Sequence, residues 1–236
     1  EDLLERPVIE MDTENVGTIL EGQTVMVTGA AGSIGSEIVR QVAAFKPQTI
    51  VLFEMAESPL HDLTVDLRKE FPNQQFVPVI ADVRNVDMVK EVFEEYHPHV
   101  VFHAAAYKHV PLMEDFPAQA IFANVQGSKN VADMAIKFNA KRFVMVSTDK
   151  AVNPTNVMGA SKRIAEIYVQ SLFLKAAKEN ANCTKFITTR FGNVLGSNGS
   201  VVPYFKKQIA AGGPVTVTHP DIIRYFMTIP EASCLV

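Results

Sequence analysis

The sequence predicts an α/β protein in which a doubly wound parallel sheet is followed by a small, partial lobe. Three observations predict this class. Short apolar runs, typical of strands buried on both faces, alternate six times with longer segments of helical periodicity. A glycine-rich turn joins the first apolar run to the helical segment that follows it. Polar side chains end several later runs, and this is the edge where open α/β sheets bind ligands.

The six apolar runs are expected to form strands, because each is short and bounded by polar or turn-forming residues. The expected strands cover residues 24–28, 49–53, 76–80, 99–103, 143–147 and 185–191. The apolar spacing between them predicts helices that include residues 86–96, 117–139 and 158–178. Residues 215–218 and 224–229 are expected to form short strands, and Pro230 suits the first turn of a final helix.

The composition is that of a globular protein. Hydrophobic residues make up 47% of the 236 residues and charged residues 20%, which argues against extended disorder. The net charge of -4, without a basic cluster, gives no support to a nucleic-acid partner. The two cysteines have no metal-ligand spacing, and no apolar run has membrane-spanning length, so we expect neither a metal site nor a membrane segment in this chain.

A glycine pattern follows the first strand. Residues 29–35 read Gly-Ala-Ala-Gly-Ser-Ile-Gly, a GxxGxxG turn between strand and helix. Such glycines let backbone N–H groups approach a pyrophosphate, whose charge the helix N-terminus favours. The alternative is a tight turn whose glycines serve packing. Since a strand and a helix flank the pattern, we expect a Rossmann-type dinucleotide site that uses Gly29, Ala31, Gly32, Ser33, Ile34 and Gly35.

Glu54 ends the second strand, 19 residues past Gly35. A carboxylate there can accept hydrogen bonds from the adenosine ribose and would repel a 2′-phosphate. No lysine or arginine lies between Phe53 and Asp66 to receive such a phosphate, so NAD is favoured over NADP. The alternative is a solvated surface glutamate.

The fourth strand is followed by three small residues that would let the chain pass close to the cofactor, Ala104, Ala105 and Ala106. Lys108 comes next, at the edge expected to face substrate. Contact between Lys108 and substrate and simple solvation of this lysine are equally acceptable alternatives.

The fifth strand ends in a hydroxyl, a carboxylate and an ammonium, Thr148, Asp149 and Lys150. Met158 and Lys162 follow, four residues apart, and share one face of the next helix. This layout resembles the active site of extended short-chain dehydrogenase/reductases, whose pattern is Ser/Thr and then Tyr-x-x-x-Lys. Met158 occupies the tyrosine position and cannot carry a proton. The substitution either abolishes the chemistry or moves it to Asp149 and Lys150.

The same resemblance implies several further roles. Lys162 would hold the nicotinamide ribose. Asp82, after the third strand, would hold the adenine amino group, with the backbone N–H of Val83 at the ring. The alternative for Asp82 is an N-cap for the helix at residues 86–96. Asn124 would brace the strand that carries the catalytic hydroxyl.

A narrower resemblance rests on longer motifs, which are residues 102–111, 147–160, 190–194, 199–203 and 224–232. Together they resemble the CapD-like polysaccharide-biosynthesis proteins, the nucleotide-sugar 4,6-dehydratases, over a span from about Gly22 to the end. Methionine at the tyrosine position is typical of the large, membrane-anchored branch. The resemblance implies a piece of a longer protein that works at the cytoplasmic side of the bacterial inner membrane in capsule or other polysaccharide synthesis, with homo-oligomers possible.

The resemblance also implies a domain organisation. Residues 1–21 would be a linker or N-terminal arm, with an edge strand expected at residues 7–9. Residues 22–195 would form the NAD-binding domain with the catalytic residues, and residues 196–236 the start of a substrate-binding lobe. The substrate would be a UDP-sugar, UDP-N-acetylglucosamine first among the candidates. Its expected contacts are Lys108, Asn193, Val201, Tyr204 and Arg224.

The residues fit 4,6-dehydration. NAD would take hydride from C4 of the sugar, a base would remove the C5 proton, an acid would protonate the departing C6 hydroxyl, and NADH would return hydride to C6. Asp149 is assigned as acid at O6 and Lys150, in its neutral form, as base at C5. Asp149, through Thr148 or a water, is the candidate base at O4. The alternatives are a nucleotide-sugar C4 epimerase, which needs no C5 base, and a catalytically silent NAD-binding domain.

Overall fold

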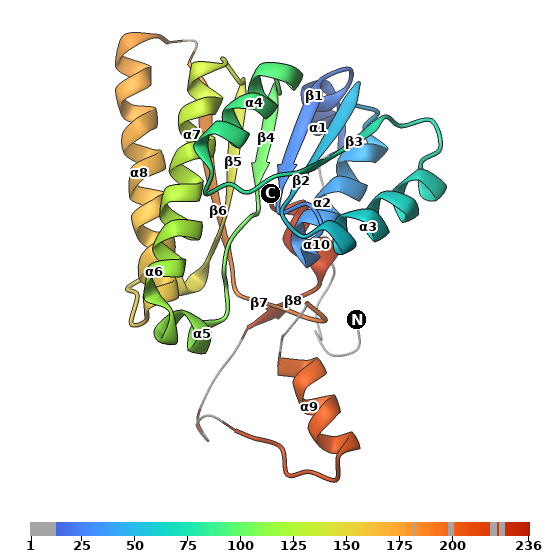
Figure 1. The fold of residues 1–236 in the computed structure, drawn as a ribbon, viewed down its shortest axis with the longest axis vertical. Helices are drawn as coiled ribbons and strands as arrows, with labels where there is room; N and C mark the ends of the chain where they lie inside the picture. Colours follow the sequence, from blue (N-terminus) through green and yellow to red (C-terminus); the bar gives the residue numbers. More distant parts are fainter. Residues whose placement is uncertain (1–12, 182, 198–200, 218–220, 222–224) are drawn as a thin grey trace.

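The computed structural model describes residues 13–181, 183–197, 201–217, 221 and 225–236. Its centre is a six-stranded parallel sheet with the order β3-β2-β1-β4-β5-β6 and helices on both faces (Figure 1). The strands are β1 Thr24–Thr28, β2 Thr49–Glu54, β3 Phe76–Ile80, β4 Val100–His103, β5 Arg142–Thr148 and β6 Lys185–Phe191. All six predicted strands are confirmed to within one residue at each end.

The strand order reverses between β1 and β4. Thr28 at the end of β1 pairs with Phe53 of β2 on one side and with His103 of β4 on the other. The connection from β3 to β4 therefore crosses the sheet, which leaves a crevice at the carboxyl ends of β1 and β4. In open α/β sheets this switch point is where ligands bind.

Two hydrophobic cores, one on each face, hold the helices to the sheet. Along β1, Val25 and Val27 face one core and Met26 the other, as the two-residue period of a strand requires. The first core packs against the helices α1 Thr13–Leu20, α2 Ser33–Ala44 and α3 Glu57–Glu70. The second core packs against α4 Val86–Tyr96, α7 Gly127–Lys137 and α8 Val157–Glu179. Burial on both faces explains the uninterrupted apolar runs in the sequence.

The helix predicted at residues 117–139 is divided into three segments. These are α6 Pro117–Ala120, the π-helical segment η1 Ile121–Gln126 and α7. Within η1, the side chain of Asn124 is buried and bonds the backbone N–H and C=O of Tyr107 and the hydroxyl of Ser161. Asn124 therefore braces the chain after β4 against α8. The expectation that it braces β5, the strand of the catalytic hydroxyl, is wrong.

The segment expected to be an N-terminal arm contains a helix that the sequence did not predict. In α1, Leu20 is only 3% exposed and lies in the first core, so these residues belong to the folded domain. The edge strand expected at residues 7–9 lies outside the described residues.

The segment after β6 returns to the sheet. β7 Asn193–Val194 pairs in parallel with β8 Phe226–Met227, and α10 Ile229–Cys234 packs against α2 (Figure 1). Thr228 and Glu231 form a capping box with Pro230 in the first turn, so the predicted final helix is confirmed. Residues 215–217 form no strand; Thr216 is instead hydrogen-bonded to the side chain of Gln208 on the helix α9 Val201–Ala210. The strand expected at 224–229 is limited to Phe226–Met227 among the described residues.

Candidate active site

The glycine turn brings the end of β1 against the chain that follows β4. Gly29 has φ of +67°, and a Cβ there would lie 2.7 Å from the backbone nitrogen and Cα of Ala105. Only glycine allows this approach. Gly32 is the N-cap of α2 and supplies no side-chain acceptor, so the helix begins with backbone donors directed at the crevice. The glycine turn and the alanines after β4 therefore lie against each other at the crevice.

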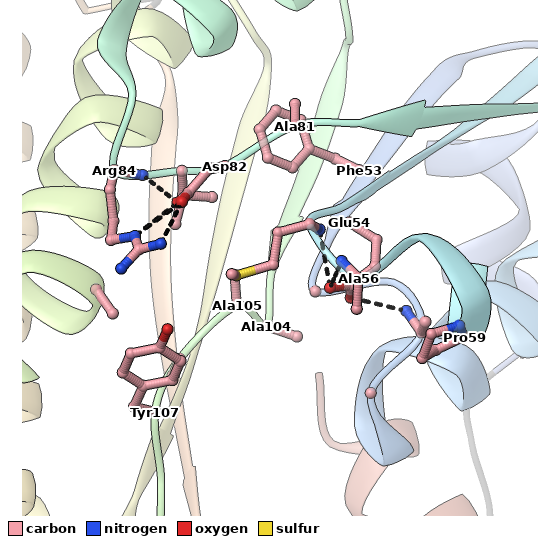
Figure 2. A pocket seen from close by; sticks show the side chains of 17 residues that line it. Phe53, Glu54, Ala56, Pro59, Ala81, Asp82, Arg84, Ala104, Ala105 and Tyr107 are labelled. Atoms are coloured by element: carbon pink, nitrogen blue, oxygen red, sulfur yellow. Dashed lines mark hydrogen bonds and ion pairs between the residues drawn. The ribbon is translucent and has the colours of Figure 1, made fainter. Parts of the chain in front are cut away.

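A cavity of about 320 Å³ lies beside this turn (Figure 2). Glu54 stands on one side and Asp82 with Arg84 on the other. Oε1 of Glu54 accepts the N–H groups of Met55 (2.9 Å) and Ala56 (3.1 Å), and Oε2 accepts that of Ala31 (3.2 Å). The half-buried carboxylate is thus fixed against the glycine turn and is not a solvated surface group.

Asp82 is held by its near neighbour Arg84. Its Oδ1 accepts the backbone N–H of Arg84 (2.9 Å) and Nε (3.0 Å), and Oδ2 accepts Nε (2.8 Å) and Nη2 (2.6 Å). The hydrogen bonds and charge of Arg84 outweigh partial burial and lower the pKa of Asp82. The N-cap of α4 is Asn85, which accepts from the N–H groups of Asp87 and Met88, so the alternative that Asp82 caps this helix is wrong.

A second cavity, of about 330 Å³, lies at the carboxyl end of β5. It continues from the region of the glycine turn, since Ile34, Ala104 and Ala106 line it as well. Most of the predicted catalytic and substrate-contacting residues line it, namely Lys108, Thr148, Lys150, Met158, Lys162, Asn193 and Val201. Tyr204, on α9, is 55% exposed and is not part of this lining. Arg224 lies outside the described residues.

Thr148, Asp149 and Lys150 form one hydrogen-bonded group. Asp149 Oδ1 accepts from the hydroxyl of Thr148 (2.9 Å) and from Nζ of Lys150 (3.0 Å). The chain turns here into a single 3₁₀ turn, η2 Asp149–Ala151, which the Thr148 hydroxyl caps. Partial burial raises the pKa of Asp149, but the hydrogen bonds from Lys150 and Thr148 and the lysine charge outweigh it and lower the pKa. Asp149 is therefore an anion at neutral pH.

The start of α8 packs directly against this turn. A Cβ on Gly159 would clash with the carbonyl oxygen of Lys150, so the helix can begin here only with glycine. Met158 beside it is 3% exposed and packs with Met113 and Ala120. The position that carries tyrosine in the wider superfamily is thus an apolar, filled site.

Lys162, one turn further along α8, is 4% exposed. Burial lowers its pKa to about 8, and the charge of Glu166 partly offsets that effect. Glu166 is itself held by the Ser147 hydroxyl (2.6 Å) and by Arg190 (2.8 and 2.5 Å). Sequence reasoning missed Glu166, although its place four residues after Lys162 put both on one helix face.

His103 also went unassigned, and the structure places it at the centre of the switch point. It is fully buried, and burial lowers its pKa to about 3, so the ring is neutral. The Ser128 hydroxyl donates to the carbonyl of Asn124 (2.6 Å), so it accepts from Nε2 of His103 (2.9 Å). Nδ1 then accepts from the Thr28 hydroxyl (2.8 Å). This chain of bonds ties β1, β4 and η1 together beneath the glycine turn.

Among the described residues, no group of three or more His, Cys, Asp or Glu side chains could hold a metal ion. Over the same residues, every helix is too short or too polar to cross a lipid bilayer.

The fold and the glycine turn define a Rossmann-type protein of the short-chain dehydrogenase/reductase class. The chain belongs to a family of polysaccharide biosynthesis proteins, which matches residues 25–236. It is 55% identical to the capsular polysaccharide biosynthesis protein CapD of Staphylococcus aureus, over 100% of this chain and 39% of that protein. The chain thus spans about two fifths of that relative's length.

Two further proteins are similar to this chain over most of its length. A UDP-glucose 4-epimerase of Rickettsia canadensis is 38% identical over 91% of this chain and 61% of that protein. The X-ray structure of Pen from Bacillus thuringiensis has a TM-score of 0.84 at 34% identity and covers 92% of this chain and 66% of that one. The class and family predicted from the sequence motifs are therefore confirmed.

Proposed function

We propose that this chain is the catalytic part of an NAD-dependent nucleotide-sugar 4,6-dehydratase that acts on a UDP-sugar, with UDP-N-acetylglucosamine as the candidate substrate. The observation that carries the proposal is the hydrogen-bonded group of Thr148, Asp149 and Lys150, of which Thr148 and Lys150 line a cavity together with Met158 and Lys162. Membership of the polysaccharide biosynthesis family supports this class of substrate.

The residues at the switch point fit a dinucleotide cofactor. The close approach of Gly29 to Ala105 leaves no room for a larger residue, and the N-terminus of α2 faces the same crevice. Glu54 retains one acceptor position on Oε2, which can receive a ribose hydroxyl. Lys162 at the base of the second cavity would hold the second ribose. Bound NAD would supply a hydride acceptor for C4 and, once reduced, a hydride donor for C6.

The protein residues then need to transfer two protons, one from O4 and one from C5 of the sugar. Thr148 already donates to Asp149, so it can receive the O4 proton and pass its own proton to the carboxylate. Asp149, protonated by that transfer, delivers the proton to O6 as water departs. Lys150 donates to Asp149 in the structure, so it would first release a proton to solvent; in that neutral form it takes the C5 proton and returns it to C5 at the end. Each residue finishes in the state in which it began, and Met158 need not exchange a proton.

The same cavity could instead serve a C4 epimerase, and the identity to the Rickettsia epimerase favours that as the second candidate. An epimerase needs oxidation at C4 but no proton transfer at C5. The lysine of the Thr-Asp-Lys group would then have no catalytic task. The dehydratase therefore accounts for more of the site.

Mass spectrometry combined with NMR of UDP-N-acetylglucosamine incubated with the full-length protein tests the proposal. We expect a product lighter by one water. A product of unchanged mass but altered stereochemistry would indicate the epimerase, and unchanged substrate would indicate a silent domain. Lys129→Ala, which removes an exposed lysine paired with Asp133 on α7, is a suitable control and should behave like the wild type. A location at the cytoplasmic side of a membrane, in a longer anchored protein, remains a prediction.

A further inference from the structure

A buried carboxylate on α8 has no task in the proposed proton transfers. Glu166 is 4% exposed and lies one turn after Lys162. Its carboxylate accepts from the Ser147 hydroxyl (2.6 Å), from Nε (2.8 Å) and Nη2 of Arg190, and from Nη1 of Arg163 (3.1 Å). Burial raises the pKa of Glu166, but these hydrogen bonds outweigh burial and lower it, so Glu166 is an anion at neutral pH.

The hydrogen bonds of Glu166 join three elements that carry the site. Ser147 directly precedes Thr148 at the end of β5, and Arg190 lies one residue before the end of β6. Thr148 and Lys162 line the second cavity. A buried ion pair often adds no net stability over apolar packing, so stability alone does not account for this one.

Lys162 is surrounded mainly by groups that cannot balance its charge. Among the described residues, the other titratable side chains that line the second cavity include no carboxylate, and they are Tyr107, Lys108, His109 and Lys150. Burial, together with the charge of Lys162, keeps the fully buried ring of His103 neutral. Asp149 is already bonded to Lys150. Glu166 is thus the anion that shares a buried helix face with Lys162.

Loss of the charge on Glu166 would leave Lys162 among cations. Burial lowers the pKa of Lys162 to about 8, while the charge of Glu166 raises it. Without the carboxylate, Arg163 and Arg190 would keep their charges and lose the anion that they share, so the buried ammonium would lose its proton at a lower pH. A neutral amine offers only uncharged donors, which make weaker hydrogen bonds to a ribose hydroxyl.

We propose that Glu166 is a positioning residue of the second cavity, which holds α8 against the ends of β5 and β6 and supplies the negative charge that keeps Lys162 an ammonium for the cofactor's ribose. This inference rests on the proposed NAD cofactor and adds how the site keeps its ribose-binding group charged. Because Met158 is apolar, the balancing charge comes from the turn after Lys162 and not from the turn before it.

NMR titration of the chain labelled with carbon-13 at lysine Cε tests the charge role without any ligand. The signal that is missing in Lys162→Met identifies Lys162, and its midpoint in the wild type is expected near pH 8. Glu166→Gln, which keeps the shape of the side chain, should lower that midpoint by about one pH unit or more. Glu179→Gln removes an exposed carboxylate at the end of the same helix and is the matched control, with no shift expected.

Calorimetric titration with NAD at a series of pH values tests the consequence for binding. The wild type should lose affinity by about tenfold as the pH rises through the midpoint of Lys162, because the charge-assisted hydrogen bond is lost. In Glu166→Gln the same loss should occur at a lower pH, displaced by the shift that NMR measures. Absence of NAD binding by the wild type would contradict the proposed cofactor, and the NMR midpoints would still decide the charge role.

Two further variants separate the charge from the bracing contacts. Ser147→Ala removes one hydrogen bond but keeps the carboxylate, so it should lower the melting temperature and leave the midpoint of Lys162 unchanged. Glu166→Gln combined with Arg190→Gln removes the ion pair as a whole and replaces Glu166→Gln should that variant fail to fold; its midpoint should fall as well. An unchanged midpoint in either folded Glu166 variant would show that Glu166 is only a brace and would overturn the inference.

Discussion

At the scale of single residues, the site combines an anion and a lysine that are only one residue apart. Asp149 is held as a carboxylate by two donors, and Met158 is enclosed by apolar side chains. Asp149 and Met158 therefore differ in what a substitution is expected to change. Under the proposed mechanism we expect substitutions at Asp149 or Lys150 to change the chemistry and substitutions at Met158 to change only packing. That contrast can be measured.

Lys150→Ala should block removal of the C5 proton while leaving oxidation at C4 possible. The loss of a positioned base typically costs about 10²–10⁴ in rate. The variant loaded with substrate should accumulate bound NADH and fail to exchange C5–H with deuterated solvent, as followed by absorbance and NMR. Met158→Leu keeps the volume of a 3%-exposed side chain and should retain most activity. Wild-type exchange in Lys150→Ala, or an inactive Met158→Leu, would refute the assignment.

Lys162 links the site to the stability of the fold. Its pKa in the folded protein is lowered from 10.5 to about 8, so the folded state disfavours the charged lysine. Below pH 8 the protein is destabilised by burying that charge, on the order of 3 kcal/mol, and the cost disappears as the pH rises toward 10.5. Lys162→Met should therefore unfold at higher urea than the wild type at pH 7, with the two converging by about pH 10.

The exposed Lys129 offers a control for this pH dependence. Lys129→Met should show no comparable convergence with the wild type, because Lys129 is 49% exposed. A Lys162→Met advantage of equal size at pH 7 and pH 10 would mean that the gain comes from packing and not from the buried charge.

At the scale of helices and strands, replacing glycine by alanine should have opposite effects on stability at two positions within helices. In Gly159→Ala the new methyl group meets the carbonyl of Lys150, so the start of α8 must move away from the turn η2. In Gly17→Ala the methyl group meets only a side-chain carbon of Phe45 at 3.8 Å. Alanine is favoured over glycine inside a helix by about 0.5–1 kcal/mol. We expect Gly17→Ala to raise the melting temperature and Gly159→Ala to lower both stability and kcat. Equal effects of the two changes would contradict this account.

Some of the helices and strands could be predicted from sequence patterns, and others could not. The six strands could be predicted from apolar runs because both faces of a parallel sheet are buried. The predicted strand ends differ from those in the structure by at most one residue. The π segment η1 could not be predicted from apolar spacing, and Asn124 within it bonds Tyr107 and Ser161, both distant in sequence. Residues 215–217 were expected to form a strand because they are β-branched. The structure shows no strand there, since β-branched residues form one only where a partner strand exists.

Most residues of the site could be predicted from the sequence, but their hydrogen bonds and ion pairs could not. The spacing of Thr148, Asp149 and Lys150 placed them at a strand end. In the structure Thr148 and Lys150 line one cavity with Lys162, and Asp149 is hydrogen-bonded to both Thr148 and Lys150. The pairing of Asp82 with Arg84, two residues away, depends on the loop conformation before α4, and no periodicity reveals it. The partners of Glu166, on β5 and β6, and those of His103, on β1 and α7, are likewise known only once these elements pack together.

At the scale of the whole molecule, the strand reversal between β1 and β4 brings two cavities together along one sheet edge. The cavity beside Glu54 belongs to the ends of β1, β2 and β3, and the cavity beside Lys150 to the ends of β4, β5 and β6. Ala104 and Ala106 line both. A dinucleotide that filled the first cavity would thus reach the second, and its binding should stabilise the entire sheet rather than one loop.

Melting curves with NAD and NADP test that expectation and the role of Glu54 together. At a concentration 100 times its Kd, a ligand that binds only the folded state adds about 2.7 kcal/mol. For a chain of this size that corresponds to a rise of roughly 5–10 °C in Tm. We expect NAD to give such a rise and NADP, at the same concentration, a much smaller one, because the Glu54 carboxylate repels a 2′-phosphate. In Glu54→Ala the NAD effect should fall and the difference between the two cofactors should narrow. Glu57→Ala, which removes an exposed carboxylate one turn further on, should behave like the wild type. A larger rise with NADP than with NAD in the wild type would show that Glu54 does not select the cofactor.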